Sequence, residues 1–322
     1  MRPGTPSRRE QSAGPRAAAE SVLRALLAAH PATAPLASAP LDPVPGGLSN
    51  FAWRADAGGG NRFVRLARET TAGLGADHRN ERRVLEVVCA AGLAPRIVHS
   101  DTDARVLVTE WIEAVDPPRP RHRAIDVVAQ ALARLHGLSP PSDLRAVDFA
   151  GQSRDLQAAL PDGERHRGLH DVAAGVFETL RRGTSSRVLC HHDLNPLNLL
   201  FDRDGRLWLV DWEYAGLGDP IFDLASYASQ QGLRAVERAR LAASYAAAGG
   251  VGLAAARLEQ ATWAFDYVQW LWYRAALAGA DAVADRELAA ARTVRLAASL
   301  RGRARRVLRC NNESFADNEI RV

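Results

Sequence analysis

The sequence predicts an α+β protein with two lobes: a small antiparallel β-sheet with one helix, followed by a larger, mainly helical lobe. Two observations predict this arrangement. Short β-like runs separated by turn residues fill residues 41–112, and beyond Pro117, Pro118 and Pro120 most segments repeat apolar residues at helical spacing. The chain has 322 residues, of which 47% are hydrophobic, and this is enough to build two such lobes.

The first lobe is expected at residues 41–112, after a loosely held leader over residues 1–40 with one short helical stretch. Residues 51–56 and 62–67 flank a glycine-rich turn and predict a hairpin. The remaining predicted elements of this lobe are one helix and two strands, at 77–91, 96–99 and 105–111.

The second lobe is expected at residues 113–300 and is helical except for a small β insertion at 197–214. Its predicted helices are 125–136, 169–182, 221–229, 235–247, 254–278 and 282–300. Residues 301–322 are expected to form a basic and polar tail.

Composition excludes several kinds of chemistry. All 41 basic residues are Arg, so a phosphate-binding loop that ends in Gly-Lys-Ser/Thr and a lysine Schiff base are excluded. Three widely spaced cysteines build neither a disulfide framework nor a CxxC zinc site. The net charge of +4 is spread along the chain, and no apolar run is long enough to span a bilayer. We therefore expect a cytoplasmic protein without nucleic-acid or membrane partners, and a homodimer remains possible.

The most informative stretch runs from residue 188 to residue 214. Asp204 and Gly205 separate two apolar runs and predict a hairpin with a two-residue turn, which places Asn198 opposite Asp211. Opposed side chains have Cβ atoms about 5 Å apart, close enough for one amide oxygen and one carboxylate to share a metal ion. Oxygen ligands with open positions suit Mg²⁺ bound together with a nucleotide, so the pattern predicts a magnesium site.

Asp193 lies in the loop before this hairpin, where a carboxylate can accept a proton from an attacking hydroxyl. The spacing His191-x-Asp193-x4-Asn198, followed by Asp211 in the hairpin, is that of a kinase catalytic loop and its metal-binding Asp. One alternative is a chance set of polar loop residues. A zinc site at residues 190–193 is disfavoured, because neighbouring strand residues point to opposite faces.

These motifs resemble the choline kinase and thiamine kinase branch of the aminoglycoside phosphotransferase-like superfamily, which has a protein-kinase-like fold. The similarity covers about residues 44–274, and its most specific strings are HHDLNPLN at 191–198 and VDWEYAG at 210–216. Supporting strings are GGLSN at 46–50 and ARLH at 133–136. The resemblance implies the cofactors ATP and Mg²⁺, with Asp193 as catalytic base and Asn198 and Asp211 as metal ligands.

The resemblance also implies roles for other positions. The nucleotide-binding residues would be Gly47, Ser49 and Asn50 over the phosphates, Arg65 with its ion-pair partner Glu81, and Glu110 and Ile112 at the hinge that binds adenine. Structural support for the catalytic loop would come from His191 and Asp223. The open alternatives are a surface ion pair for Arg65 and Glu81 and a solvent-facing helix position for Asp223.

The acceptor site is predicted from aromatic residues near carboxylates, because ring faces and one counter-charge hold a quaternary ammonium group. Its candidate residues are Glu213, Asp266, Trp270 and Tyr273. The alternative for the aromatics at 263–273 is a helical core stripe, and the alternative for Glu213 is contact with a metal ligand.

Three functions follow from these expectations. The first is transfer of the γ-phosphoryl group of ATP to the hydroxyl of a small cationic alcohol of the choline, ethanolamine or thiamine type. The second is an aminoglycoside-type phosphotransferase, disfavoured by an arginine-rich helical lobe. The third is a nucleotide-binding pseudokinase sensor, disfavoured because Asp193, Asn198 and Asp211 are all present.

Overall fold

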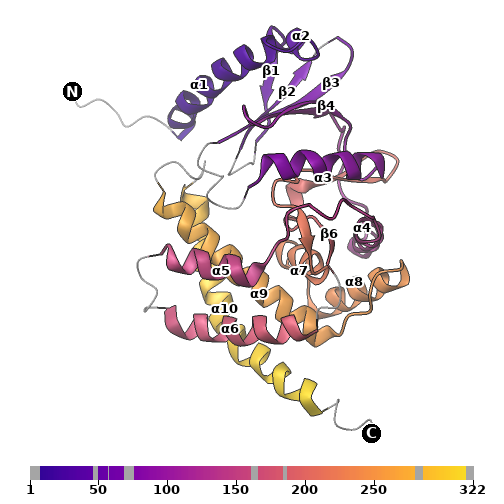
Figure 1. Cartoon of the computed structure of the whole chain (residues 1–322), viewed down its shortest axis with the longest axis vertical. Helices are drawn as coiled ribbons and strands as arrows, with labels where there is room; N and C mark the ends of the chain where they lie inside the picture. The colour runs from indigo at the N-terminus through magenta and orange to yellow at the C-terminus, as the bar shows by residue number, and fades with distance from the viewer. Residues whose placement is uncertain are drawn as a thin grey trace, which may run out of the picture.

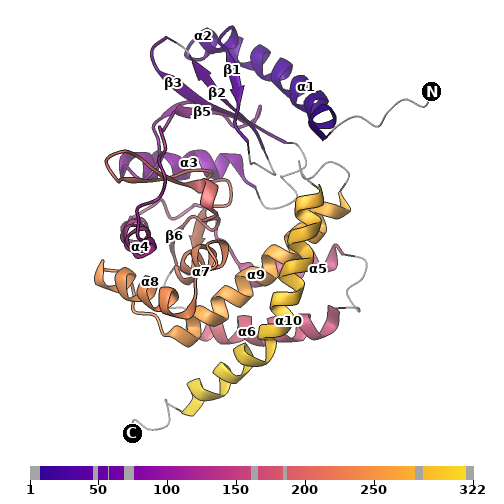
Figure 2. The same ribbon diagram turned by 180° about the vertical axis from the view of Figure 1, so that it is seen from behind.

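The computed structural model describes residues 8–45, 50–56, 58–68, 76–160, 166–183, 187–279 and 286–316. Figure 1 shows a small lobe built on a sheet and a larger lobe of helices, with helix α3 (His78–Ala90) lying between them. The view from behind in Figure 2 shows the same two layers. The predicted α+β class is confirmed.

The small lobe contains a five-stranded antiparallel sheet with strand order β1-β2-β3-β5-β4. Its strands are β1 (Leu41–Pro43), β2 (Asn50–Asp56), β3 (Asn61–Ala67), β4 (Ile97–Asp101) and β5 (Val106–Glu110). The predicted hairpin is the pair β2–β3, in which Trp53 lies opposite Val64. β1 is an additional edge strand that the sequence pattern did not predict.

The amino-terminal segment differs from the expected loose leader. Residues 8–40 contain α1 (Arg8–Ala28) and the short α2 (Ala34–Ala37), where the sequence predicted one short helical stretch. Leu23 and Leu27 of α1 are 0% and 1% exposed and share a hydrophobic cluster with Trp53 and Val64 of the sheet. The apolar face of α1 therefore covers the outer face of the sheet, which the alanine-rich and proline-rich composition of this segment concealed.

Helix α3 packs below the sheet. The side chain of Asp77 caps it by accepting a hydrogen bond from the backbone N–H of Asn80 at 3.0 Å. Its buried face, which includes Val84 and Val88, belongs to the same core cluster as the helices of the large lobe. The small lobe and the helical lobe thus share one hydrophobic core through α3.

The large lobe contains seven α-helices in its described part. They are α4 (Arg121–His136), α5 (Phe149–Ala158), α6 (Arg167–Arg182), α7 (Ile221–Gln230), α8 (Ala235–Ala247), α9 (Ala255–Ala278) and α10 (Arg286–Ala316). Helix α5 was not predicted. The expected end of the lobe at residue 300 is also wrong, because α10 continues to 316 and buries Val307 completely.

The hairpin that carries the polar motif has a different register from the predicted one. Strands β7 (Leu199–Phe201) and β8 (Leu207–Leu209) place Leu200 opposite Trp208, and the ends of the turn, Asp202 and Arg206, are joined by a backbone hydrogen bond of 3.0 Å. The loop therefore has three residues and ends at Gly205, whose φ of +77° favours glycine. Asn198 pairs with Val210, one position before Asp211.

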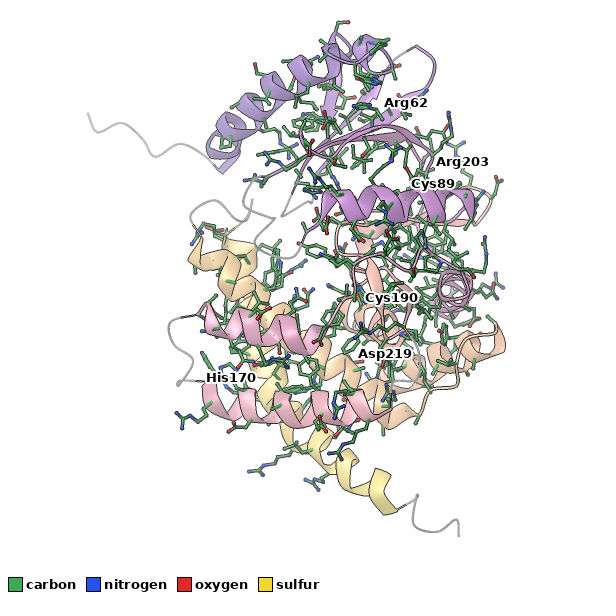
Figure 3. All side chains as sticks on the ribbon, viewed as in Figure 1. Arg62, Cys89, His170, Cys190, Arg203 and Asp219 are labelled. Carbon is green, nitrogen blue, oxygen red and sulfur yellow. The ribbon has the colours of Figure 1, made fainter. Side chains whose placement is uncertain are left out.

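Side chains fill the interior of both lobes in Figure 3, where Cys190 and Asp219 lie among the helices of the large lobe. Asp219 caps α7, because its carboxylate accepts a hydrogen bond from the backbone N–H of Ile221 at 3.0 Å. Among the described helices, none has an apolar stretch of the length needed to cross a membrane.

Candidate active site

The loop that carries Asp193 is fixed from below by one buried carboxylate. Asp223 of α7 is 0% exposed and accepts hydrogen bonds from the backbone N–H groups of His191, at 2.9 Å, and His192, at 2.7 Å. His192 has a φ of +68°, a conformation that costs a non-glycine residue free energy and is retained here by these bonds. The structure thus places Asp223 in the interior, under the loop, and not on a solvent-facing helix surface.

A short chain of polar groups holds Asp223 in turn. His136 at the end of α4 lies 3.0 Å from Asp223 through Nε2, and its Nδ1 lies 2.7 Å from the hydroxyl of Tyr245. Burial alone would raise the pKa of Asp223, but the hydrogen bond and charge of His136 lower it to about 2. The carboxylate is therefore ionised over the whole physiological range.

Asp193 has one engaged and one open carboxylate oxygen. The side-chain amides of Asn195 and Asn198 donate to its Oδ2 at 2.9 and 3.0 Å. No described residue hydrogen-bonds to Oδ1, which faces the cleft. Burial raises the pKa of Asp193 to about 7, and the nearby carboxylate of Asp211 adds to the rise. A carboxylate with a pKa in this range is suited to accept a proton at neutral pH.

His191 connects this loop to the strand that leads to Asp211. Its ring is 0% exposed, packs against Trp212, and places Nε2 at 3.0 Å from the carbonyl oxygen of Val210. Because Nε2 faces a carbonyl, it carries the proton, and Nδ1 accepts from the backbone N–H of Asp193 at 3.3 Å. His191 therefore supports the loop that carries Asp193.

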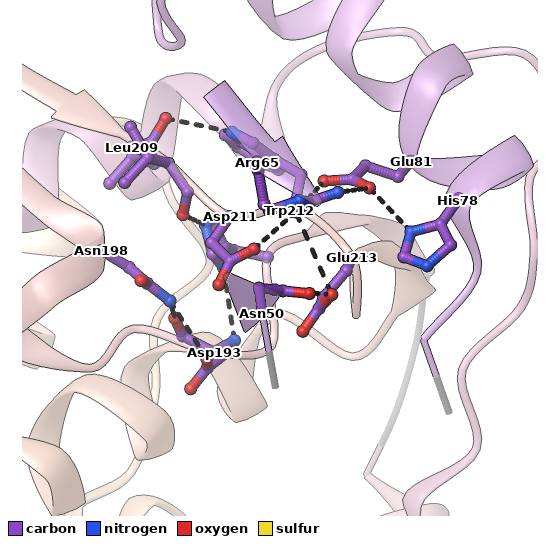
Figure 4. Close-up of polar contacts among 12 residues, drawn as sticks. Asn50, Arg65, His78, Glu81, Asp193, Asn198, Leu209, Asp211, Trp212 and Glu213 are labelled. Carbon is purple, nitrogen blue, oxygen red and sulfur yellow. Dashed lines mark hydrogen bonds and ion pairs between the residues drawn. The ribbon is translucent and has the colours of Figure 1, made fainter. Parts of the chain in front are cut away.

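Arg65 of β3 joins the two lobes. Figure 4 shows its guanidinium between Glu81 of α3 and Asp211. Its two terminal nitrogens donate to the two oxygens of Glu81 at 2.8 and 2.5 Å, and Nη1 also donates to Oδ1 of Asp211 at 2.7 Å. Arg65 is 4% exposed, and the pair with Glu81 is buried and bidentate, so it is not a surface ion pair.

The charged groups around Arg65 shift the pKa values of Arg65 and of its partner Glu81. Burial alone would raise the pKa of Glu81, but Arg65 and His78 lower it below its ordinary value. Burial alone would lower the pKa of Arg65. Three carboxylates raise it above its ordinary value instead, those of Glu81, Asp211 and Glu213. Arg65 is therefore a permanent positive charge at the floor of the cleft.

The donor set at this position fits Mg²⁺. Asn198 directs its amide nitrogen toward Asp193 and leaves its carbonyl oxygen free, while Asp211 uses only Oδ1 for Arg65. Burial raises the pKa of Asp211, and the mutual repulsion of Asp193 and Asp211 favours a cation beside them. Two oxygen donors with further positions left for phosphate and water are the usual protein contribution to a magnesium–nucleotide site.

Glu213 does not lie at the acceptor end of the cleft. It is 1% exposed, accepts a hydrogen bond from the side chain of Asn50 at 3.1 Å and lies 4.0 Å from Arg65. Burial and the charge of Asp211 raise its pKa well above the ordinary value. Of the two predicted roles, the structure favours the one beside Asp211, the candidate metal ligand, and cation recognition by Glu213 is not supported.

The cleft between the lobes has a volume of 1210 Å³. Its nucleotide end is lined by Asn50 and Arg65 and by the segment after β5, which includes Glu110 and Ile112. Glu110 pairs with Arg96 at 2.8 Å on the surface side. Gly47 and Ser49 lie outside the described residues.

Two predicted acceptor residues belong to the core. Asp266 is 6% exposed and bonds to the hydroxyl of Ser229 and the guanidinium of Arg303. Trp270 is 1% exposed and packs against the ring of His166 and under the guanidinium of Arg274. Neither residue lines the cleft, so the prediction of both as acceptor residues is wrong, and for Trp270 the core-stripe interpretation applies.

Tyr273 is the one predicted acceptor residue that lines the helical end of the cleft, beside Asp193. The sequence reasoning missed its neighbours there, which are Phe149 of α5, Phe265, Gln269 and Trp272 of α9, and Arg292 of α10. Gln269 and Trp272 follow Phe265 at four- and three-residue steps, which is a helical-face signal. Nothing in the sequence pattern connected this face to α5 or to Arg292.

A family model described as the phosphotransferase enzyme family matches residues 40–260. The chain belongs to this family. Among its relatives, mouse ethanolamine kinase 2 is 27% identical over 195 residues, which cover 55% of this chain and 49% of the mouse protein. The chain thus spans about half the length of that relative. Two further curated relatives are covered to 65% and 18% of their length.

Solved structures show the same fold. The choline kinase LicA from Streptococcus pneumoniae superposes with a TM-score of 0.70 at 20% identity, covering 82% of this chain and 93% of that one. A choline/ethanolamine kinase family protein from Mesorhizobium loti gives a TM-score of 0.68 at 27% identity, covering 85% and 92%. The phosphotransferase family member therefore has the predicted protein-kinase-like fold.

Proposed function

We propose that this family member is an ATP- and Mg²⁺-dependent kinase that transfers the γ-phosphoryl group of ATP to the hydroxyl of a small alcohol. The observation that carries the proposal is the carboxylate of Asp193, which lies beside Asp211 in the cleft between the two lobes. Two asparagine amides donate to its Oδ2, and its Oδ1 is open. A related LicA structure is described as a complex with AMP, which supports a nucleotide at this end of the cleft.

The reaction uses the groups of the site as follows. The alcohol oxygen attacks the γ-phosphorus, its proton passes to Asp193, and the bond between the γ-phosphorus and the bridging oxygen breaks to release ADP. Asn195 and Asn198 hold the carboxylate in place, and Arg65 contributes positive charge near the phosphates. Mg²⁺ bound to Asn198 and Asp211 would neutralise phosphate charge.

The class of acceptor is supported by the names of three similar proteins, which are choline or ethanolamine kinases. These names favour an alcohol of a few carbon atoms. The expectation of a purely cationic acceptor is weakened here, because Asp266 and Glu213, its two predicted counter-charges, are engaged with Arg303 and with Asn50.

The test is turnover of Mg·ATP by Asp193→Asn, measured as ADP release with choline, ethanolamine, L-serine and glycerol as acceptors. We expect turnover to fall at least about a hundredfold, because a general base typically contributes that much. Binding of ATP measured by calorimetry is expected to change little. Asp204→Asn, an exposed position in the nearby hairpin turn, serves as the matched control.

Two results contradict the proposal. Full activity of Asp193→Asn excludes Asp193 as the base. A wild-type protein that neither binds Mg·ATP nor releases ADP with any acceptor is not a kinase of this kind.

A further inference from the structure

The helical end of the cleft contains a positive side chain that the proposed reaction does not use. Arg292 of α10 lines this end together with Tyr273 of α9. Its Nη1 donates a hydrogen bond to the hydroxyl of Tyr273, which fixes the orientation of the guanidinium. The side chain is partly buried and lines the cleft.

Arg292 has no carboxylate partner within the part of the chain that the structure describes, and its Nε is buried without an acceptor. Two other arginines of the same helix have carboxylate partners: Arg303 binds Asp266, and Arg306 binds Glu259. A partly buried guanidinium without a counter-ion is costly, and the cost is relieved when a ligand brings an anion.

Arg292 lines the same cleft as the proposed base. Arg292, Tyr273 and Asp193 all line this cleft, and the hydroxyl of Tyr273 accepts the hydrogen bond from Arg292. The charge of Arg292 also acts on Asp193, where it lowers the pKa of the carboxyl against the larger effect of burial. The alcohol must lie in this cleft to reach Oδ1 of Asp193.

A second donor at this end of the cleft lacks an acceptor in the described part of the chain. The indole Nε1 of Trp272 is buried, lines the same space and has no acceptor among the described residues. The acidic side chains on the α5 wall, Asp148 and Asp155, are exposed, where water screens their charge. The chemistry of this end of the cleft thus favours a ligand with an electron-rich oxygen group.

We propose that the acceptor is an alcohol that also carries a carboxylate, and that Arg292 binds this carboxylate while the hydroxyl lies at Asp193. The proposal rests on the proposed kinase function and specifies its substrate class. A guanidinium fork matches the two oxygens of a carboxylate, so Arg292 determines specificity through charge and geometry together.

The test compares acceptors that differ only in the carboxylate. The pairs are L-serine with ethanolamine, L-homoserine with 3-amino-1-propanol, and glycerate with ethylene glycol. We expect kcat/KM from ADP release to be at least about tenfold higher for the carboxylate-bearing member of one or more pairs, as a charge-assisted hydrogen bond provides. Arg292→Gln should abolish the preference, mainly through KM, and Arg292→Lys should restore it in part.

Arg301→Gln is the matched control, because Arg301 is exposed on the same helix and lies outside the cleft. This variant should keep the wild-type preference. Unfolding of each variant in urea separates loss of fold from loss of recognition.

Three results overturn the proposal. Equal or better turnover of the acceptors without a carboxylate excludes it and leaves the kinase function intact. An equal drop for both members of every pair in Arg292→Gln assigns Arg292 to the phosphoryl group. If no acceptor is turned over while Mg·ATP binds, calorimetry with Mg·ADP must show binding of L-serine, L-homoserine or glycerate that depends on Arg292, and its absence overturns the proposal.

Discussion

At the scale of single residues, Asp223 shows how one carboxylate fixes a catalytic loop. It satisfies two consecutive backbone N–H groups in the interior and receives a third hydrogen bond from His136. Buried donors that lose their acceptor cost about 1–3 kcal/mol each. The loop therefore keeps the positive φ of His192, and with it the position of Asp193, only while Asp223 is present and ionised.

Asp223→Asn should lower the free energy of unfolding at pH 7 by about 2 kcal/mol or more, because the pKa of Asp223 is about 2 in the folded protein against 3.8 as its ordinary value. Because folding lowers the pKa of Asp223, its ionised carboxylate stabilises the fold at pH values above the ordinary pKa of 3.8, and this contribution is lost as the pH falls toward 2. The difference between wild type and variant should therefore shrink by about 1 kcal/mol between pH 5 and pH 3 in urea unfolding. A difference that stays constant with pH would exclude this linkage.

The residues of the site differ in how far apart they lie in the sequence, and this distance decides whether a sequence pattern can predict them. Asp193, Asn198 and Asp211 lie in one stretch with a fixed spacing, and the structure brings them to one end of the cleft. Arg65 and Glu81 lie 16 residues apart but on consecutive elements, and they form a bidentate pair. Arg292 reaches the site from the last helix, and no spacing in the sequence relates it to Asp193.

At the scale of elements, helix α1 packs on the sheet although its composition does not indicate a packed helix. Its buried positions Leu23 and Leu27 are four residues apart and pack on Trp53, although the surrounding residues are mostly Ala, Arg and Glu. Few large apolar residues are needed, because the outer face of the sheet supplies the rest of the cluster.

Leu27→Ala is expected to destabilise the protein by about 2–5 kcal/mol, because it removes a side chain that is 1% exposed. Val22→Ala is the matched control, since Val22 is 55% exposed on the same helix and should change stability by less than about 0.5 kcal/mol. Urea unfolding of the two variants measures both values. Equal, small effects would mean that α1 does not pack on the sheet in solution.

Elements could be predicted where periodicity was long and regular. Helix α8 begins and ends where the pattern predicts, and α4, α6, α7 and α9 lie within a few residues of it. The β7–β8 register was missed by one residue, because turn length depends on the positive φ of Gly205 and not only on the residue types Asp-Gly. Helix α10 was predicted too short because its arginines after residue 300 were interpreted as a solvated end, whereas Arg303 and Arg306 bind carboxylates of α9.

At the scale of the whole molecule, the two lobes are joined by more than the covalent connection after β5. The side chain of Asn80 on α3 donates to the carbonyl oxygen of Ala215 at 2.8 Å and accepts from the backbone N–H of Arg145 at 2.9 Å. Together with Arg65 and Asp211, these bonds hold α3 against the helical lobe. The width of the cleft at its closed side is thereby fixed by buried contacts.

Asn80→Ala should therefore lower the free energy of unfolding by about 1–3 kcal/mol, because two backbone groups of the large lobe lose their partners. Its neighbour Arg79 is the control: among the described residues its side chain forms an ion pair with exposed Asp103, and exposed pairs contribute little, so Arg79→Ala should cost clearly less than Asn80→Ala. Thermal unfolding followed by circular dichroism compares the two. An Asn80→Ala variant as stable as Arg79→Ala would show that α3 is held by apolar packing alone.

The shared core of α3 also determines where this chain can be divided. Val84 and Val88 pack with the helices of the large lobe, whereas Trp53 and Val64 pack with α1 on the opposite face of the sheet. A chimaera joined after β5 would combine α3 from one parent with packing partners from the other, and its larger core would be mismatched. An exchange that keeps both cores intact would transfer α1, α2 and the sheet residues that pack on them, but retain α3 and Leu107 of β5. The natural module boundary is therefore a surface within the small lobe and not a single point in the chain.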